Sequence, residues 1–427
     1  MAGLRRGGGS AALLAIVGML AMADTAHARP PSSPVVTGAE TLARSGFARL
    51  AGRRVGLIAN QTSRVGAEHL ADLLAKAPGL TLTAILAPEH GFRGAIEAGA
   101  KVGDTVDART GVPVFSLYGA TRKPTPAMLR DVDVLVFDIQ DIGTRFYTYI
   151  STMGLAMQAA AAARIPFVVL DRPNPLGGAY VSGFVLEAPL ASFVGQYPIP
   201  IVHGMTAGEL AGMIKGEAWL DGLGALDLMV VPLEGWRRAM LWPELGRTWV
   251  ATSPNIPTFD AAHVYPGMGL VGEADVNEGR GTPTPFSLLG APWVNGASLA
   301  ARLDAAGLGG VRFTAHAYTP RSIPGVALSP RFEGRRLDGV HIEVTDPAVF
   351  APLETGMHVL AALFAETRAK GIARPIANLA MLHALAGTRR LHRLLADGRS
   401  AADIIAAWQP EVASFRAQRA RYLLYGE

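Results

Sequence analysis

Short runs of apolar residues alternate with amphipathic segments over the first half of the chain. Six runs have the length and composition of buried strands: Val55–Ala59, Thr81–Ala87, Val112–Leu117, Val132–Phe137, Pro166–Leu170 and Leu226–Val231. Helical patterns lie between them, at Ala67–Lys76, at Tyr147–Arg164 and from the capping box Thr206–Glu209 toward Glu217. This alternation predicts an α/β fold with a Rossmann-like, mostly parallel sheet and helices on both faces.

A polar segment follows each of four expected strands. These segments are Asn60–Ser63, Glu89–Arg93, Asp138–Arg145 and Asp171–Asn174. Parallel strands place their carboxyl ends along the same edge of a sheet, and open α/β sheets bind ligands at that edge. The sequence therefore predicts that these four segments lie together and form the functional site.

The regular pattern gives way from Trp236 to Trp293 to a segment rich in Pro, Gly and Trp, which we interpret as irregular and functional. Regular elements return after Gly296. Helices are expected at Ser298–Ala306, Glu354–Lys370, Ser400–Trp408 and, restarting after Pro410, Val412–Arg419, with strands at Val311–Ala317 and Gly339–Val344. We therefore expect a catalytic domain over residues 38–295 and a smaller α+β C-terminal domain over residues 296–427.

The first 28 residues have the pattern of a secretory signal peptide. Arg5 and Arg6 precede an apolar core at Ala11–Met22, and Ala26-His-Ala28 supplies small residues at the cleavage position. The apolar core is short for a membrane span, so no stable membrane insertion is expected after cleavage. These features predict an exported protein, periplasmic or extracellular. The sequence contains no Cys, which excludes disulfides, thiolate catalysis and Cys-ligated zinc.

Charge and motif content exclude several further classes. The chain carries 39 Lys and Arg against 35 Asp and Glu, with no basic stripe interleaved with aromatics, so nucleic acid is not an expected partner. Asn60-Gln-Thr-Ser63 stands where a G-x-G-x-x-G loop would follow the first strand, and no P-loop occurs. No cofactor is therefore expected. Neither the H-E-x-x-H spacing of a zinc site nor the G-x-S-x-G elbow of a serine hydrolase is present.

Glu89 and His90 are the leading catalytic candidates. They follow a strand and precede Gly91, and a carboxylate beside a histidine suits general acid–base chemistry. Asp138 and Asp141 are candidate partners, and Asp138 ranks first because it directly follows its apolar run. These three acids could instead have structural roles. Glu89 could form an ion pair within its loop, and one of the two aspartates could be a buried acid that caps the following helix.

Acidic residues in the irregular segment give further candidates for the second carboxylate. Glu273 and Glu278 lie there, and the glycines on either side of Arg280 would let the backbone approach a ligand closely. Arginines recur in the polar segments, and a guanidinium binds a carboxylate with two parallel hydrogen bonds. An acidic substrate is therefore expected.

The motifs together resemble one known family. They are Gly56–Thr62, Pro88–Gly94, Phe137–Tyr147, Asp171–Gly177, Pro200–Thr206, Ser253–Pro257, Glu278–Thr282 and Gly290–Trp293. In this order they are similar to the exo-β-N-acetylmuramidases of the NamZ/YbbC-like type, formerly a domain of unknown function. The resemblance extends from about Val55 to Tyr425. One departure is Gly272–Asn277, where family members more often carry an E-G-T-N-like run.

The resemblance implies release of N-acetylmuramic acid from the non-reducing ends of peptidoglycan fragments, in a cleft between a Rossmann-like domain and an auxiliary domain. It implies Glu89 as the leading catalytic residue. We predict that Glu89 is the general acid and that Arg145 or Arg280 holds the lactyl carboxylate. The residues expected to bind substrate are Asn60, Arg93, Gln140, Arg145, Tyr147, Asn174, His203, Asn255 and Arg280.

Two other functions stay open from the sequence. One is a non-catalytic protein that binds peptidoglycan fragments, since aromatic side chains and arginines suffice for binding. The other is a metal-dependent hydrolase that uses His90, Asp138 and His203.

Overall fold

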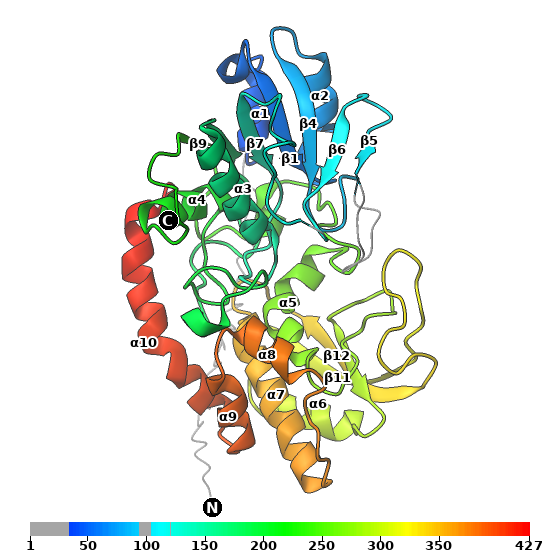
Figure 1. The fold of residues 1–427 in the computed structure, drawn as a ribbon. Helices are drawn as coiled ribbons and strands as arrows, with labels where there is room; N and C mark the ends of the chain where they lie inside the picture. The colour runs from blue at the N-terminus through cyan, green and yellow to red at the C-terminus, as the bar shows by residue number, and fades with distance from the viewer. Residues whose placement is uncertain (1–33, 94–103, 120) are drawn as a thin grey trace, which may run out of the picture.

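The computed structural model describes residues 34–93, 104–119 and 121–427. The expected signal peptide, residues 1–28, lies outside this part of the chain. A large, mostly parallel sheet occupies one end of the described molecule and a small antiparallel sheet the other, with helices around both (Figure 1). The predicted fold class is confirmed.

The larger sheet has the strand order β5-β6-β4-β1-β7-β8-β9. Its strands are β1 (Arg54–Ala59), β4 (Thr81–Ala87), β5 (Thr105–Val106), β6 (Pro113–Ser116), β7 (Val134–Asp138), β8 (Phe167–Leu170) and β9 (Leu228–Val231). Every pair is parallel except β5 with β6. The carboxyl ends of β1, β4, β7 and β8, which the four polar segments follow, therefore share one edge, as the sequence predicts.

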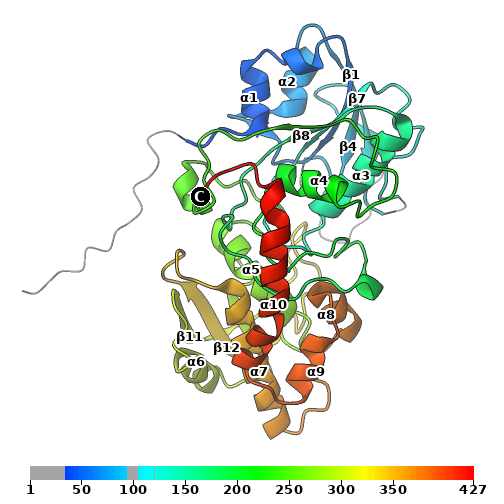
Figure 2. The same cartoon turned by 90° about the vertical axis from the view of Figure 1, so that its left-hand side faces the viewer.

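Helices cover both faces of this sheet, which Figure 2 shows from the side. On one face α1 (Gly38–Arg44) packs on β8 and β9, and α2 (Leu70–Lys76) packs on β4. On the other face α3 (Tyr149–Ala163) and α4 (Ala207–Gly216) join the main hydrophobic core of the protein. A small hairpin, β2 (Arg64–Val65) with β3 (Glu68–His69), precedes α2.

The smaller sheet has the order β10-β12-β11 and is antiparallel. Its strands are β10 (Leu288–Ala291), β11 (Val311–Tyr318) and β12 (Leu337–Val344). The helices around it are α5 (Phe259–Val271), α6 (Gly296–Asp304), α7 (Pro352–Ala369), α8 (Leu379–Ala386) and α9 (Arg390–Ala396). Strand β10 precedes residue 296, and its partner β12 follows it. The small sheet therefore contains strands from both sides of the expected domain boundary. The boundary itself stays a prediction.

The last helix, α10 (Ala401–Arg419), runs along the side of the molecule and returns the C-terminus to α4 (Figures 1 and 2). The prediction of two helices separated at Pro410 was wrong. The residues that α10 buries are Ala401, Ile404, Trp408, Val412, Phe415 and Arg419. Their spacing of three or four residues makes one continuous buried stripe that is apolar as far as Phe415. Burial on both sides of Pro410 therefore outweighs the backbone hydrogen bond that the proline removes.

Two further features differ from the prediction: the first residue of α2, and a helix in the segment expected to be irregular. Helix α2 begins at Leu70 rather than Ala67, because Glu68–His69 forms the hairpin and His69 Nδ1 accepts the N–H of Ala71 at 3.2 Å as the helix cap. The stretch expected to be irregular contains the 13-residue α5. Its Gly267 packs on Gly356 of α7 so closely that a Cβ on Gly356 would lie 2.5 Å from Gly267 Cα, so the glycines that weaken the helical pattern permit this crossing.

No helix in the described part of the chain combines the length and the apolar character needed to cross a bilayer.

Candidate active site

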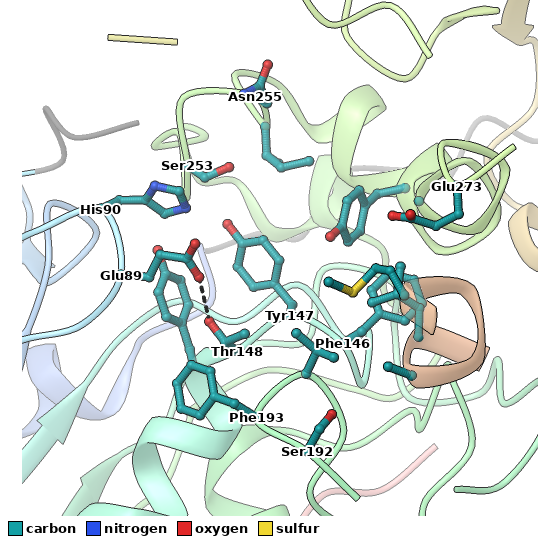
Figure 3. Close-up of a pocket in the computed structure, with 18 of the residues that line it drawn as sticks. Glu89, His90, Phe146, Tyr147, Thr148, Ser192, Phe193, Ser253, Asn255 and Glu273 are labelled. Atoms are coloured by element: carbon teal, nitrogen blue, oxygen red, sulfur yellow. Dashed lines mark hydrogen bonds between the residues drawn. The ribbon is translucent and has the colours of Figure 1, made fainter. Parts of the chain in front are cut away.

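A cavity of about 610 Å³ lies between the carboxyl edge of the larger sheet and the helices α5 and α8. Its walls come from distant parts of the chain: the loops after β4 and β6, the start of α3, and the segments Ser192–Val194 and Ser253–Ile256. Figure 3 shows this pocket with Glu89 and Glu273 on opposite sides of Tyr147. We take it as the candidate active site.

Glu89 lies two residues beyond the end of β4, past Pro88. His90 and Gly91 adopt left-handed backbone angles of 70° and 76°, which turn the chain at the sheet edge. The Thr148 hydroxyl donates to Glu89 Oε2 at 2.9 Å, and Thr148 precedes the N-terminus of α3. The carboxylate therefore stands where the dipole of α3 favours negative charge. Burial, followed by the charge and hydrogen bond of Glu89, raises the pKa of Tyr118 to about 12.

Aromatic rings form the wall between the two carboxylates. Tyr147 contacts Tyr149 and Tyr265 edge to face, with ring centroids 5.0 and 5.9 Å apart, and Tyr265 contacts Phe286 at 4.9 Å. The Tyr147 hydroxyl donates to Thr252 Oγ1 at 2.8 Å. Packing fixes these rings, and they offer a sugar a rigid surface on which an apolar face can stack.

Glu273 is the second carboxylate of the pocket. It follows α5 and faces the cavity (Figure 3). Burial, and after it the negative charge of Glu278, raises the pKa of Glu273 to about 7, against the opposing charges of Arg280 and Arg331. Glu278 forms an ion pair with Arg280, whose guanidinium lies 5.0 Å from the centre of the Phe286 ring.

Six predicted site residues line this pocket: Glu89, His90, Tyr147, Asn255, Glu273 and Arg280. Glu278 reaches the site through its ion pair with Arg280. The pocket also contains residues outside the predicted set, namely Tyr118, Arg122, Thr148, Phe193, Asn378 and Met381. Tyr118 directly follows the predicted strand Val112–Leu117, and Thr148 directly follows the motif Phe137–Tyr147. Local sequence signals therefore point to both residues. Segments 192–194 and 378–385 carry no motif, so only the tertiary structure brings them here.

The structure does not place Asp138 in the pocket. Asp138 is the last residue of β7, fully buried, and its carboxylate accepts from Arg172 Nε at 2.6 Å and Nη2 at 2.9 Å. This two-point ion pair uses both carboxylate oxygens inside the sheet. Asp138 is therefore a structural acid, and its ranking as the first partner of Glu89 is corrected.

Asp138→Asn is expected to lower the free energy of unfolding by about 3–5 kcal/mol, because it leaves the buried Arg172 guanidinium without its counter-charge. Denaturant titration measures this loss. The control is Glu343→Gln, which breaks the exposed pair with Arg312 and should cost less than about 1 kcal/mol. Wild-type stability in Asp138→Asn would contradict the structural role.

Arg145 is also corrected as a ligand for the substrate carboxylate. Its side chain is fully buried, and the guanidinium donates to three backbone carbonyls at 2.7–2.8 Å, those of Phe184, Ile199 and Leu385. Burial lowers its pKa to about 9. Arg145 therefore ties the loops that support the pocket to the end of α8.

Asp141 and His203 lie together outside the pocket. Their side chains are 4.0 Å apart, and Asp141 also accepts the N–H of Gly143 at 2.7 Å. Burial raises the pKa of Asp141 to about 7 and lowers that of His203 to about 3. His203 Nδ1 accepts the N–H of Met205, so the neutral ring carries its proton on Nε2. Neither residue lines the pocket.

Four other predicted ligands have structural partners instead. Asn60 accepts from Thr62 in a turn, and Asn174 donates to the Met205 carbonyl. Arg93 pairs with Asp107 at 2.8 Å and Asp72 at 3.3 Å, and Gln140 donates to the Asp141 and Pro173 carbonyls. None of the four lines the pocket. Among residues 34–93, 104–119 and 121–427, no three His, Cys, Asp or Glu side chains form a metal-binding group, so His90, Asp138 and His203 do not converge.

Comparison with known proteins agrees with this architecture. Two family models match the chain, described as the N-terminal and C-terminal parts of the exo-β-N-acetylmuramidase NamZ, over residues 55–260 and 263–425. The peptidoglycan β-N-acetylmuramidase NamZ of Bacillus subtilis strain 168 is 40% identical over 406 residues, which are 94% of each chain.

Two solved structures from Bacteroides fragilis, both of a family named as a domain of unknown function, have the same fold. The first superposes with a TM-score of 0.83 at 37% identity, and the second with a TM-score of 0.75 at 34% identity. Each comparison covers 92% of this chain and all of the other.

Proposed function

Because the chain belongs to the NamZ family of exo-β-N-acetylmuramidases, we propose that it releases N-acetylmuramic acid from the non-reducing ends of peptidoglycan fragments. The observation that carries the proposal is the position of Glu89. It lies at the carboxyl end of β4, in a cavity of about 610 Å³ that is large enough for a sugar and lined by aromatic rings and a second carboxylate.

Hydrolysis of a glycoside uses two carboxyl groups with separate tasks. We assign proton donation to the glycosidic oxygen to Glu89, which the Thr148 hydroxyl holds at the sheet edge. Glu273 in its ionised form stabilises the positive charge that develops at the anomeric carbon. The Thr148 hydroxyl fixes the position of Glu89. Burial and the charge of Glu278 raise the pKa of Glu273 to about 7, so Glu273 becomes ionised as the pH rises through about 7.

The direct test is release of free N-acetylmuramic acid from a disaccharide that carries it at the non-reducing end. We expect turnover on this substrate and much slower turnover on the matching N-acetylglucosaminide. Tight binding of the muramide without turnover would instead indicate a binding protein. Loss of activity with a chelator and its recovery with a divalent metal would indicate the metal-dependent alternative.

The sequence of the first 28 residues supports a further proposal about location. Its basic start, apolar core and Ala26-His-Ala28 site suit an exported protein that meets its substrate in the cell-wall compartment. N-terminal mass analysis of the protein from its native host is the test. A mature chain that begins at Arg29 supports export, and an intact Met1 terminus on the active protein argues against it.

A further inference from the structure

Two arginines and no lysine line the pocket within the described chain, and they have different surroundings. Arg280 is held by the buried carboxylate of Glu278, with Glu273 close enough for its charge to act on the same guanidinium. Its guanidinium is therefore already paired with Glu278, and a substrate carboxylate would have to compete with that ion pair.

Arg122 lies at the Glu89 end of the pocket. Its side chain is exposed, and it forms no ion pair with any residue of the described chain. Its guanidinium stacks on the Phe193 ring at 4.3 Å from the centroid, and the Phe193 ring lies 6.3 Å from that of Tyr118. The charge of Arg122 also opposes the effect of Glu89 on the pKa of Tyr118, so all three groups share one electrostatic neighbourhood.

We infer that Arg122 binds the lactyl carboxylate by which N-acetylmuramic acid differs from N-acetylglucosamine, an inference that rests on the proposed function. Phe193 covers one face of the guanidinium and leaves its N–H edge available for a two-point contact with a carboxylate. Arg122 brings a positive charge to this end of the pocket.

The chemistry of the sugar agrees with this position. The lactyl group is attached to carbon 3 of the ring, two ring atoms from the anomeric carbon on which the general acid acts. The residue that holds the lactyl carboxylate must therefore lie within about one sugar of the general acid. Arg122 meets this condition through Tyr118, which contacts both Glu89 and the Phe193 ring.

Two substrates isolate the interaction: an aryl β-glycoside of N-acetylmuramic acid, and the same glycoside with its lactyl carboxylate converted to the methyl ester. For the wild type, we expect kcat/KM to favour the free acid by about 10- to 100-fold, as for a charge-assisted hydrogen-bonded pair. Arg122→Gln should abolish this preference, mainly through a higher KM for the free acid, so that the free acid and the ester have similar kcat/KM. Arg122→Lys should recover only part of it, because an ammonium group cannot form the two-point contact.

Arg335→Gln is the matched control, since Arg335 is also exposed and stacks on a ring, that of Phe332 at 5.7 Å, but does not line the pocket. It should keep the wild-type preference. If Arg122→Gln retains the preference for the free acid, or if Arg280→Gln alone abolishes it, the assignment of Arg122 is wrong. Absence of wild-type turnover on both glycosides would reject the proposed function instead, so the two failures are distinguishable.

Discussion

Glu89→Gln is expected to lower kcat on an N-acetylmuramyl disaccharide by ~10²–10⁴-fold, the usual contribution of general acid catalysis. The amide has the shape of the carboxyl group and can still accept from the Thr148 hydroxyl, so the loop and the start of α3 should keep their structure. It cannot supply a proton to the departing sugar. The measurement is the steady-state rate of N-acetylmuramic acid release.

The leaving group separates proton donation from other roles of Glu89. An aryl muramide whose phenol is acidic departs without protonation, so Glu89→Gln should slow this substrate far less than the disaccharide. Equal losses on both substrates would contradict the general-acid role and would point to a role at the anomeric carbon. Glu343→Gln, a change of the same chemistry at a solvent-facing side chain of β12 outside the pocket, should retain full activity.

The sequence predicts Glu89 and misplaces Asp138 for a definable reason. Both carboxylates follow an apolar run, but β4 ends at Ala87, two residues before Glu89, whereas β7 ends at Asp138 itself. The first side chain is beyond the sheet and reaches the cavity. The second stays within the sheet and meets Arg172 from the loop after β8. An apolar run followed by an acid does not distinguish these cases, because it does not fix the residue at which the strand ends.

Two arginines also show that a local sequence pattern does not predict which distant segments surround a side chain. Arg145 lies in a strong motif, yet its guanidinium is enclosed by carbonyls of Phe184, Ile199 and Leu385. Arg122 lies in no motif and opens into the pocket. Whether an arginine holds loops together or binds a ligand depends on which distant segments surround it. Local patterns predict the parallel sheet and its functional edge, since these follow from chain order, but they contain no information on such partners.

Glu273→Gln is expected to lower kcat/KM by ~10²–10⁴-fold, in the range of a positioned acid or base, and to do so equally on the disaccharide and on the activated aryl muramide. The reason is that stabilisation of the anomeric carbon is needed whichever group departs. This pattern is the opposite of the one expected for Glu89→Gln. A leaving-group dependence in Glu273→Gln and none in Glu89→Gln would exchange the two roles.

The pH dependence gives an independent test of Glu273. Because its pKa is raised to about 7, the wild-type kcat/KM should increase as the pH rises through about 7 and Glu273 becomes ionised. Glu273→Gln should remove this increase from the residual rate. The raised pKa of Glu273 also makes the stability of the fold depend on pH. The folded state binds the Glu273 proton more tightly than the unfolded chain does, in which the pKa of this carboxyl is near 4.5. Its contribution is full below pH 4.5 and is lost as the pH rises through about 7.

The variant should therefore lack this part of the decline in stability between pH 4.5 and 7, which denaturant titrations at several pH values would measure. Asp141 also has a pKa near 7 and lies outside the pocket, so Asp141→Asn is the matched control. It should alter the pH dependence of stability and keep the pH dependence of kcat/KM. If Asp141→Asn removes the activity increase and Glu273→Gln keeps it, the proton that limits catalysis belongs to Asp141, and Glu273 loses its role as the second carboxylate.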